Sequence, residues 1–169
     1  MTTEDTYLPQ DLADLLDRIE REWTALLAAV ESLSPEQMVR RKGDRWSIKD
    51  HLAHVTEWER FLILNQFEGQ PAHVALGIDR SLTEGPDEAG INAVLQARHR
   101  DRPLPDVLAD LVRTHDWVLA ELGKRSFADL QKRTRVMGPD EKPMLLWVIY
   151  NTYEHYLEHR LTIEASEAA

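Results

Sequence analysis

The sequence predicts an all-α protein, a four-helix bundle with long connections and short extra helical turns. Apolar residues recur at three- and four-residue spacing over four long segments. No stretch alternates apolar and polar residues between hairpin-type turns, so no sheet is expected. The chain has 169 residues, of which 43% are hydrophobic. This is enough for one continuous core, and we expect residues 1–169 to form a single domain.

The first predicted helix follows Pro9, because a first helical turn tolerates proline. Its apolar residues have the spacing of an amphipathic helix: Leu12, Leu15, Leu16, Ile19, Trp23, Leu26, Leu27, Val30 and Leu33. Ser34 before Pro35 then predicts a short helical turn, and a charged connection is expected over 40–45.

The second predicted helix begins at Ser47, because a serine followed three residues later by Asp50 can cap a helix start. Its apolar positions are Ile48, Leu52, Val55, Trp58, Leu62 and Phe67. Gly, Pro, Asp and Ser accumulate between Gly69 and Gly90, which predicts the longest loop of the chain.

Helical spacing resumes at Ile91 and continues to Gly123, with an interruption at Pro103 and Pro105. Because proline breaks a helix interior, we expect one broken or kinked third helix. A further short helical turn is predicted over 126–130.

The fourth long helix is predicted from near Pro143 to about Ala165. A Gly-Pro turn over 136–142 is expected to precede it. Four long helices joined by substantial connections favour a four-helix bundle, in which sites are built in the core from facing helices.

Composition narrows the classes of function. Acidic residues outnumber basic ones 30 to 20, for a formal net charge of −10. The densest basic stretches, 98–102 and 124–135, are interrupted by acidic or apolar residues, so we expect no nucleic-acid partner. The absence of cysteine fits a reducing cytoplasm. Residues 1–10 lack the order of a secretory signal, and no apolar run approaches the roughly 20 residues of a membrane span. We therefore expect a cytoplasmic protein without a membrane partner.

The main chemical signal is a set of four histidines in two helical pairs, His51 with His54 and His155 with His159. At about 100° per residue, the second pair shares one arc of its helix with five other side chains. These are Leu145, Val148, Thr152, Tyr156 and Ile163. The pair is therefore expected to face the core. A purely structural role, with each imidazole bonded to a carbonyl or a carboxylate, is the alternative.

A third histidine would turn this pair into a metal site. His51 and His54 both project to one flank of the second helix, on the side of Trp58. Either could join His155 and His159 if that flank borders the fourth helix. Three neutral imidazoles with an open fourth position form catalytic zinc sites, and they also accept nickel or iron.

Other candidates carry weaker signals, and no catalytic residue is assigned. Four glutamates neighbour the histidines in sequence: Glu57, Glu59, Glu154 and Glu158. We expect them to be mostly solvated charges, although one could act as a general base or as an acceptor for a ligand histidine. His115 is expected to be structural, and His73 and His99 are not expected to bind metal. The motifs of serine hydrolases, nucleotide hydrolases and dinucleotide-binding folds do not occur in the sequence.

Two segments carry a family resemblance. They run from Trp46 to Trp58 (WSIKDHLAHVTEW) and from Asn151 to His159 (NTYEHYLEH). They resemble the DinB/YfiT superfamily of metal-associated four-helix bundles. In that superfamily a Trp-Ser or Trp-Thr opens the second helix, a metal-binding histidine follows eight residues after the Trp, and a His-x-x-x-His pair in the fourth helix completes the site.

The resemblance implies a particular metal set. Trp46 leads to His54, which selects His54 over His51 as the third ligand beside His155 and His159. The ion implied is nickel or zinc, with iron also compatible. The fourth segment is also similar to a branch that contains ClbS/DfsB-type proteins, some of which have lost the metal histidines. This sequence keeps all three.

The resemblance further implies a detoxifying or stress-related reaction on a small electrophilic molecule. The reaction would be a hydrolysis or a transfer to a low-molecular-weight thiol, with mycothiol, bacillithiol or glutathione as co-substrate. Related bundles often form homodimers, which we expect here as well. The alternative is a non-catalytic bundle that binds a small molecule or dimerises, with a structural metal.

Overall fold

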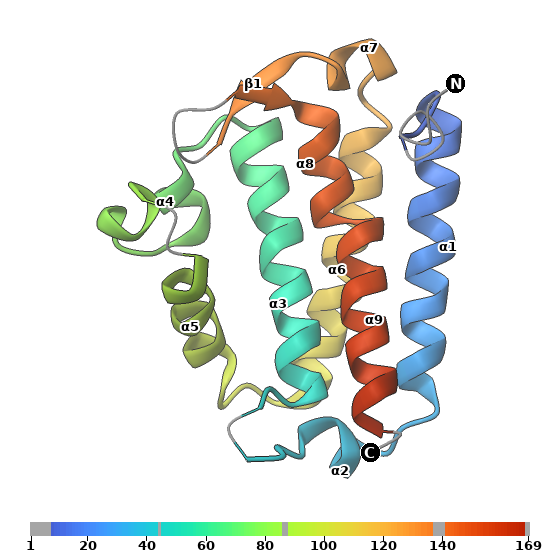
Figure 1. Cartoon of the computed structure of the whole chain (residues 1–169), viewed down its shortest axis with the longest axis vertical. Coiled ribbons are helices and arrows are strands. Elements are labelled where there is room, and N and C mark those ends of the chain that lie inside the picture. The colour runs from blue at the N-terminus through green and yellow to red at the C-terminus, as the bar shows by residue number, and fades with distance from the viewer. Residues whose placement is uncertain (1–7, 44, 86–87, 137–140, 168–169) are drawn as a thin grey trace.

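The computed structural model describes residues 8–43, 45–85, 88–136 and 141–167. Its long helices lie side by side as a bundle (Figure 1). The bundle consists of α1 (Leu12–Glu31), α3 (Ile48–Phe61), α6 (Leu104–Leu122) and the consecutive pair α8 (Met144–Asn151) and α9 (Tyr153–Glu167). Helix α9 packs on α1 and on α3, and α3 also packs on α6. The all-α, four-helix-bundle prediction is therefore confirmed.

Helix α1, Leu12–Glu31, begins where the Asp11 side chain accepts a hydrogen bond from the backbone N–H of Asp14. Its buried side chains follow the predicted stripe: Leu15, Ile19, Trp23, Leu26 and Val30. Helix α2, Pro35–Val39, begins at Ser34, which forms a reciprocal capping box with Gln37.

Helix α3, Ile48–Phe61, begins at the predicted cap. The Ser47 hydroxyl accepts the backbone N–H of Asp50, and the Asp50 carboxylate accepts the backbone N–H of Ser47. Asp50 is buried and also pairs with Arg41 at 2.9 Å. The helix then continues as a wider π-helical segment, η1, Leu62–Phe67. This cap fixes where α3 begins, and so fixes the positions of His51 and His54, about one and two turns further along.

The predicted loop between Gly69 and Gly90 is not a simple loop. It contains helix α4, Ala72–Leu76, and the 3₁₀ turn η2, Arg80–Thr83, and the first turn of helix α5, Glu88–His99, begins within it. Residues 86 and 87 of the predicted loop lie outside the described residues. A second cluster of buried side chains explains the order in this segment, because α4 and α5 pack on α3 through Trp58, Phe61, Leu76, Ile91 and Leu95.

The expectation of one kinked third helix is wrong. Helices α5 and α6, Leu104–Leu122, are separate elements on different faces of α3 (Figure 1). Pro103 is the N-cap of α6 and Pro105 lies in its first turn, so the two prolines start a new helix. Periodicity continues on both sides of the interruption because each helix has its own buried face.

The connection between α6 and α8 contains a short helix, α7, Phe127–Leu130, as predicted. The expectation that no strand occurs is wrong here, since β1, Arg133–Arg135, pairs antiparallel with β2, Glu141–Pro143. Three residues per strand are too few for an alternating pattern to stand out in the sequence. Of the predicted 136–142 turn, residues 137–140 lie outside the described residues.

The fourth bundle position is occupied by two consecutive helices where one was predicted. Helix α8, Met144–Asn151, ends at Thr152, whose backbone leaves the helical region with φ −125° and ψ −109°. The Thr152 hydroxyl donates to the carbonyl oxygen of Val148 at 2.6 Å, a bond of the kind that competes with the helical backbone pattern. Helix α9, Tyr153–Glu167, then resumes in line with α8 (Figure 1).

Among the described residues, no helix combines the length and the apolar character that crossing a bilayer requires.

Candidate metal centre

The N-terminal half of α3 lies beside α9, and the two helices run antiparallel (Figure 1). Four histidine rings meet there. The ring centroids of His54 lie 4.9 Å from those of both His155 and His159, and the latter two are 4.5 Å apart. One ring nitrogen from each of these three residues lies within 4.8 Å of the other two. The structure therefore brings together the three residues that the sequence predicts as ligands.

Two of the donor atoms have nearly the spacing that a single divalent ion requires. Nε2 of His155 and Nε2 of His159 are 3.0 Å apart. Two nitrogens bound to one tetrahedral zinc ion, each at about 2.0–2.1 Å, are separated by about 3.3 Å, a few tenths of an ångström more than this spacing. The Nδ1 atoms of His54 and His155 are buried and have no hydrogen-bond partner within the described chain. A purely structural histidine normally satisfies such an atom, so the orphaned Nδ1 of His54 argues against the structural alternative.

The three imidazoles are held in the neutral form that a metal requires. Burial, and to a smaller extent the neighbouring imidazoles, lower the pKa of His54 to about 3 and that of His155 to about 4. The same two causes lower the pKa of His159 well below its ordinary value of 6.5. At neutral pH each ring therefore offers a free lone pair, and no proton has to leave before an ion binds.

Two tryptophans flank the cluster. The indole of Trp46, just before the cap of α3, lies 4.9 Å from the ring of His54 and 5.3 Å from that of His51. Trp58 lies on the other side, 6.1 Å from His54, and its Nε1–H donates to Asn92 on α5 at 3.2 Å. Both indoles place apolar surface beside the cluster, and electrostatic interactions are stronger in such less polar surroundings than in water.

The expectation that the neighbouring glutamates are mostly solvated is wrong for two of them. Glu57 is 3% exposed and pairs with Arg60, Arg98 and His99. Burial raises its pKa, but the hydrogen bond with His99 and the two arginines bring the net pKa below its usual value. Its partners on α5 explain the error, because the sequence does not indicate which helix will cover that face of α3.

Glu59 is 0% exposed, and burial raises its pKa. The Tyr156 hydroxyl donates to it, and the Nδ1 of His115 lies 3.1 Å from the same hydroxyl. The His115 ring stacks on Trp23 at 3.9 Å. This polar network inside the core was not predicted. A signal for it exists, since Glu59 follows Val55 by four residues on the apolar stripe of α3.

The other two glutamates lie on α9. Glu158 is exposed, as expected. Glu154 is half-buried, and its pKa is raised by burial and then by Glu158. Its Oε1 atom is buried without a hydrogen-bond partner among the described residues.

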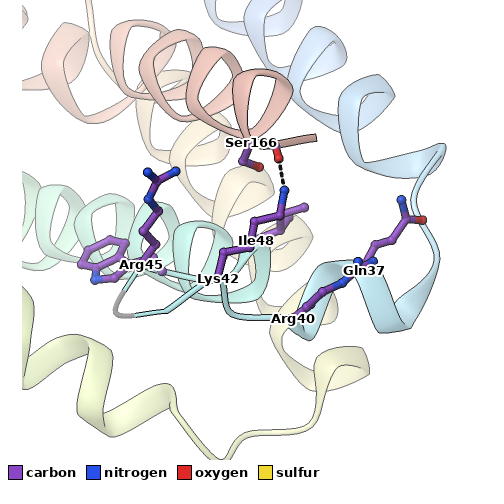
Figure 2. Close-up of a pocket in the computed structure, with 7 residues that line it drawn as sticks. Gln37, Arg40, Lys42, Arg45, Ile48 and Ser166 are labelled. Carbon is purple, nitrogen blue, oxygen red and sulfur yellow. Dashed lines mark hydrogen bonds between the residues drawn. The ribbon is translucent and has the colours of Figure 1, made fainter. Parts of the chain in front are cut away.

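A small pocket adjoins the cluster at the end of the bundle where α9 ends. It is lined by Gln37, Arg40, Lys42, Arg45, Trp46, Ile48 and Ser166. Figure 2 shows the Lys42 ammonium donating to the Ser166 carbonyl oxygen, at 2.5 Å, with Arg45 and Arg40 at opposite ends of the pocket. Because Trp46 lines this pocket and also packs on His54, the pocket and the histidine cluster share a wall.

A helical bundle with three clustered imidazoles defines an all-α protein with a candidate metal centre. Within that class, the chain belongs to the DinB superfamily, whose sequence model matches residues 18–163. Proteins of this superfamily are typically associated with a metal ion. No curated protein matches the sequence.

Solved structures share the fold at low identity. The colibactin self-resistance protein ClbS, in complex with double-stranded DNA, is 14% identical with a TM-score of 0.75, and the match covers 95% of this chain and 98% of ClbS. DfsB, described as a sibling lethal factor precursor, is 17% identical with a TM-score of 0.77, over 94% of this chain and 96% of DfsB. An uncharacterised protein from Escherichia coli UTI89 is 16% identical with a TM-score of 0.72, over 95% and 94% of the two chains. The predicted likeness to ClbS and DfsB is therefore confirmed.

The exclusion of nucleic acid as a partner was wrong. ClbS has this fold and was solved with double-stranded DNA bound. The prediction rested on the net charge and on the interrupted basic stretches 98–102 and 124–135, whereas a phosphate backbone contacts one face of a protein and not its average. The prediction also overlooked Arg40, Lys42 and Arg45, which the structure gathers around one pocket.

Proposed function

We propose that this protein is a metal-dependent enzyme in which His54, His155 and His159 hold one divalent ion. Nickel and zinc are the first candidates, and iron also suits three imidazoles. The observation that carries the proposal is the meeting of three ring nitrogens within 4.8 Å of one another, at buried or half-buried positions whose pKa values keep the rings neutral. Membership of a metal-associated superfamily supports it.

When bound, such an ion lowers the pKa of a coordinated water or thiol and supplies a nucleophile near neutral pH. The residues of the chain position the ion and shape its surroundings. His54 reaches the cluster from α3, and the other two ligands reach it from α9, so the site depends on the packing of these helices. Trp46 and Trp58 both pack against the ring of His54 and so place apolar surface beside the ligand cluster.

The substrate we propose is a small electrophilic molecule, attacked by water or by a low-molecular-weight thiol in the cytoplasm. The protein would then act in detoxification or a stress response as a hydrolase or a thiol transferase. The family resemblance supports this class of reaction. The chain has no cysteine, so a thiol nucleophile would have to come from a co-substrate.

Elemental analysis of protein purified without a metal-affinity tag tests the metal site. We expect close to one equivalent of nickel, zinc or iron, and its loss in His54→Ala and in His155→Ala. His73→Ala, on α4 and outside the cluster, is the matched control and should keep the ion. Wild-type protein that is metal-free and cannot be reloaded would overturn the proposal.

Turnover separates this proposal from a non-catalytic bundle with a structural metal. The reloaded wild-type protein is screened with thiol-acceptor and hydrolysable electrophiles, with the His54→Ala variant as the blank. Metal-dependent turnover supports an enzyme. If the metal raises the melting temperature and no turnover is detected, the result supports a non-catalytic bundle with a structural metal.

A second candidate function is contact with double-stranded DNA, which the ClbS complex brings into consideration. Arg40 and Arg45 are exposed and make no side-chain hydrogen bond or ion pair within the described chain, so both can meet phosphate. Fluorescence anisotropy with a duplex at two salt concentrations tests this contact. Affinity that falls with salt, and falls again in Arg40→Glu/Arg45→Glu but not in the control Arg21→Glu on α1, would support DNA contact. Equal affinity in all three proteins would refute it.

A further inference from the structure

The fourth histidine of the cluster, His51, lies one turn before His54 on α3. Its Nδ1 is 2.8 Å from the Nδ1 of His159, which is hydrogen-bond distance. The two ring centroids are 5.0 Å apart. His51 is not a member of the three-residue group whose donor atoms all lie close together. The residue therefore touches the candidate metal centre without the placement of a ligand.

His159 uses its two ring nitrogens on opposite sides. Nε2 lies 3.0 Å from the Nε2 of His155, and Nδ1 lies 2.8 Å from His51. A neutral imidazole carries a hydrogen on one nitrogen and a lone pair on the other. The partner of one nitrogen thus decides which nitrogen can bind an ion.

We propose that His51 is a positioning residue for His159. Its Nδ1 accepts the Nδ1–H of His159, which leaves the Nε2 of His159 with a free lone pair that faces His155. No proton is exchanged, because His51 selects one tautomer and one ring orientation. The inference rests on the proposed metal function, and it assigns to His51 a role that the sequence left open.

The three ligand candidates differ in a way that favours this role. The Nδ1 atoms of His54 and His155 are buried without hydrogen-bond partners in the described part of the chain, whereas that of His159 has one. His51 is itself held, since the Trp46 indole packs against it at 5.3 Å. Groups that orient a ligand histidine in this way typically change metal affinity by about 10- to 100-fold when they are removed.

Nitrogen-15 NMR of the histidine side chains in metal-free protein at pH 8 tests the tautomer directly. We expect His159 to carry its hydrogen on Nδ1 in the wild type. His51→Leu replaces the acceptor with an apolar side chain of similar size, and His159 should then lose this preference. His51→Gln offers a carbonyl oxygen as an acceptor and should restore it. Circular dichroism establishes that each variant is folded.

Metal titration with cobalt(II) or zinc gives the second readout. We expect affinity about 10- to 100-fold weaker in His51→Leu and recovered to within a few-fold in His51→Gln. The control His73→Leu should bind as the wild type does. If the wild type keeps the His159 tautomer but binds no metal, the proposed function fails while the positioning of His159 stands. If both His51 variants match the wild type in tautomer and affinity, or if His51→Gln does not rescue, the role of His51 is overturned.

Discussion

Acid should destabilise the metal-free protein through its histidine cluster. Burial holds the pKa of His54 at about 3 and that of His155 at about 4, against 6.5 in an unfolded chain. Between these values the unfolded state binds a proton that the folded state refuses, so stability is full above pH 6.5 and is lost as the pH falls. At pH 5 the difference of 1.5 units at about 1.4 kcal/mol per unit gives about 2 kcal/mol for each ring, or about 4 kcal/mol for the two.

Urea unfolding of chelator-treated protein at pH 8 and pH 5, followed by circular dichroism, measures this loss. The double variant His54→Gln/His155→Gln removes both titrating groups, so its pH dependence should be smaller than that of the wild type by about 4 kcal/mol. Leu52→Ala is the control for plain destabilisation, because it should lower the free energy of unfolding equally at both pH values. An identical pH dependence in the wild type and the double variant would refute the reasoning that burial keeps these rings neutral.

Three further variants test the elements that hold the site. Ser47→Ala removes the cap of α3 and should cost about 1 kcal/mol in the free energy of unfolding, with an unaltered spectrum at low denaturant. Leu52→Ala opens a cavity at a position that is 0% exposed and should cost about 2–5 kcal/mol by urea unfolding; a loss below 1 kcal/mol would contradict its place in the core. Tyr156→Phe removes the hydroxyl that donates to the buried carboxyl of Glu59. The free energy of unfolding should fall by about 1–3 kcal/mol, and the melting temperature should fall with it. An unchanged melting temperature would mean that this hydrogen bond does not stabilise the fold.

The sequence predicted the bundle and the pairing of His155 with His159 for identifiable physical reasons, whereas the choice of His54 as their partner came from the family resemblance. The cap formed by Ser47 and Asp50 sets the start of α3, and helical spacing then sets the faces of the side chains that follow. The His155 and His159 pair lies on the arc shared with Tyr156, which is fully buried. These features depend on interactions within one helix, which a sequence pattern contains.

What the sequence missed depends on contacts between elements. A periodic pattern gives each helix an apolar face but does not specify the partner, so α5 and α6 were read as one helix although they cover different faces of α3. The helix break at Thr152 was not predicted because neither a glycine nor a proline lies at that position. Glu57 lies on α3 as expected, but its burial depends on Arg98 and His99 of α5, more than forty residues away in the chain.

The segment that contains α4, η2 and α5 lies outside the four bundle positions, and its role differs from that of the bundle helices. None of the histidines of the cluster comes from it, since α3 and α9 supply them all. Yet it touches the wall of the cluster, because Asn92 on α5 accepts a hydrogen bond from Trp58, which packs beside His54. Changes in this segment can therefore reshape the approach to the imidazoles without moving them. For a laboratory that wants to redirect the protein to a new substrate, α5 is the place to randomise, with the four bundle positions left as a constant frame.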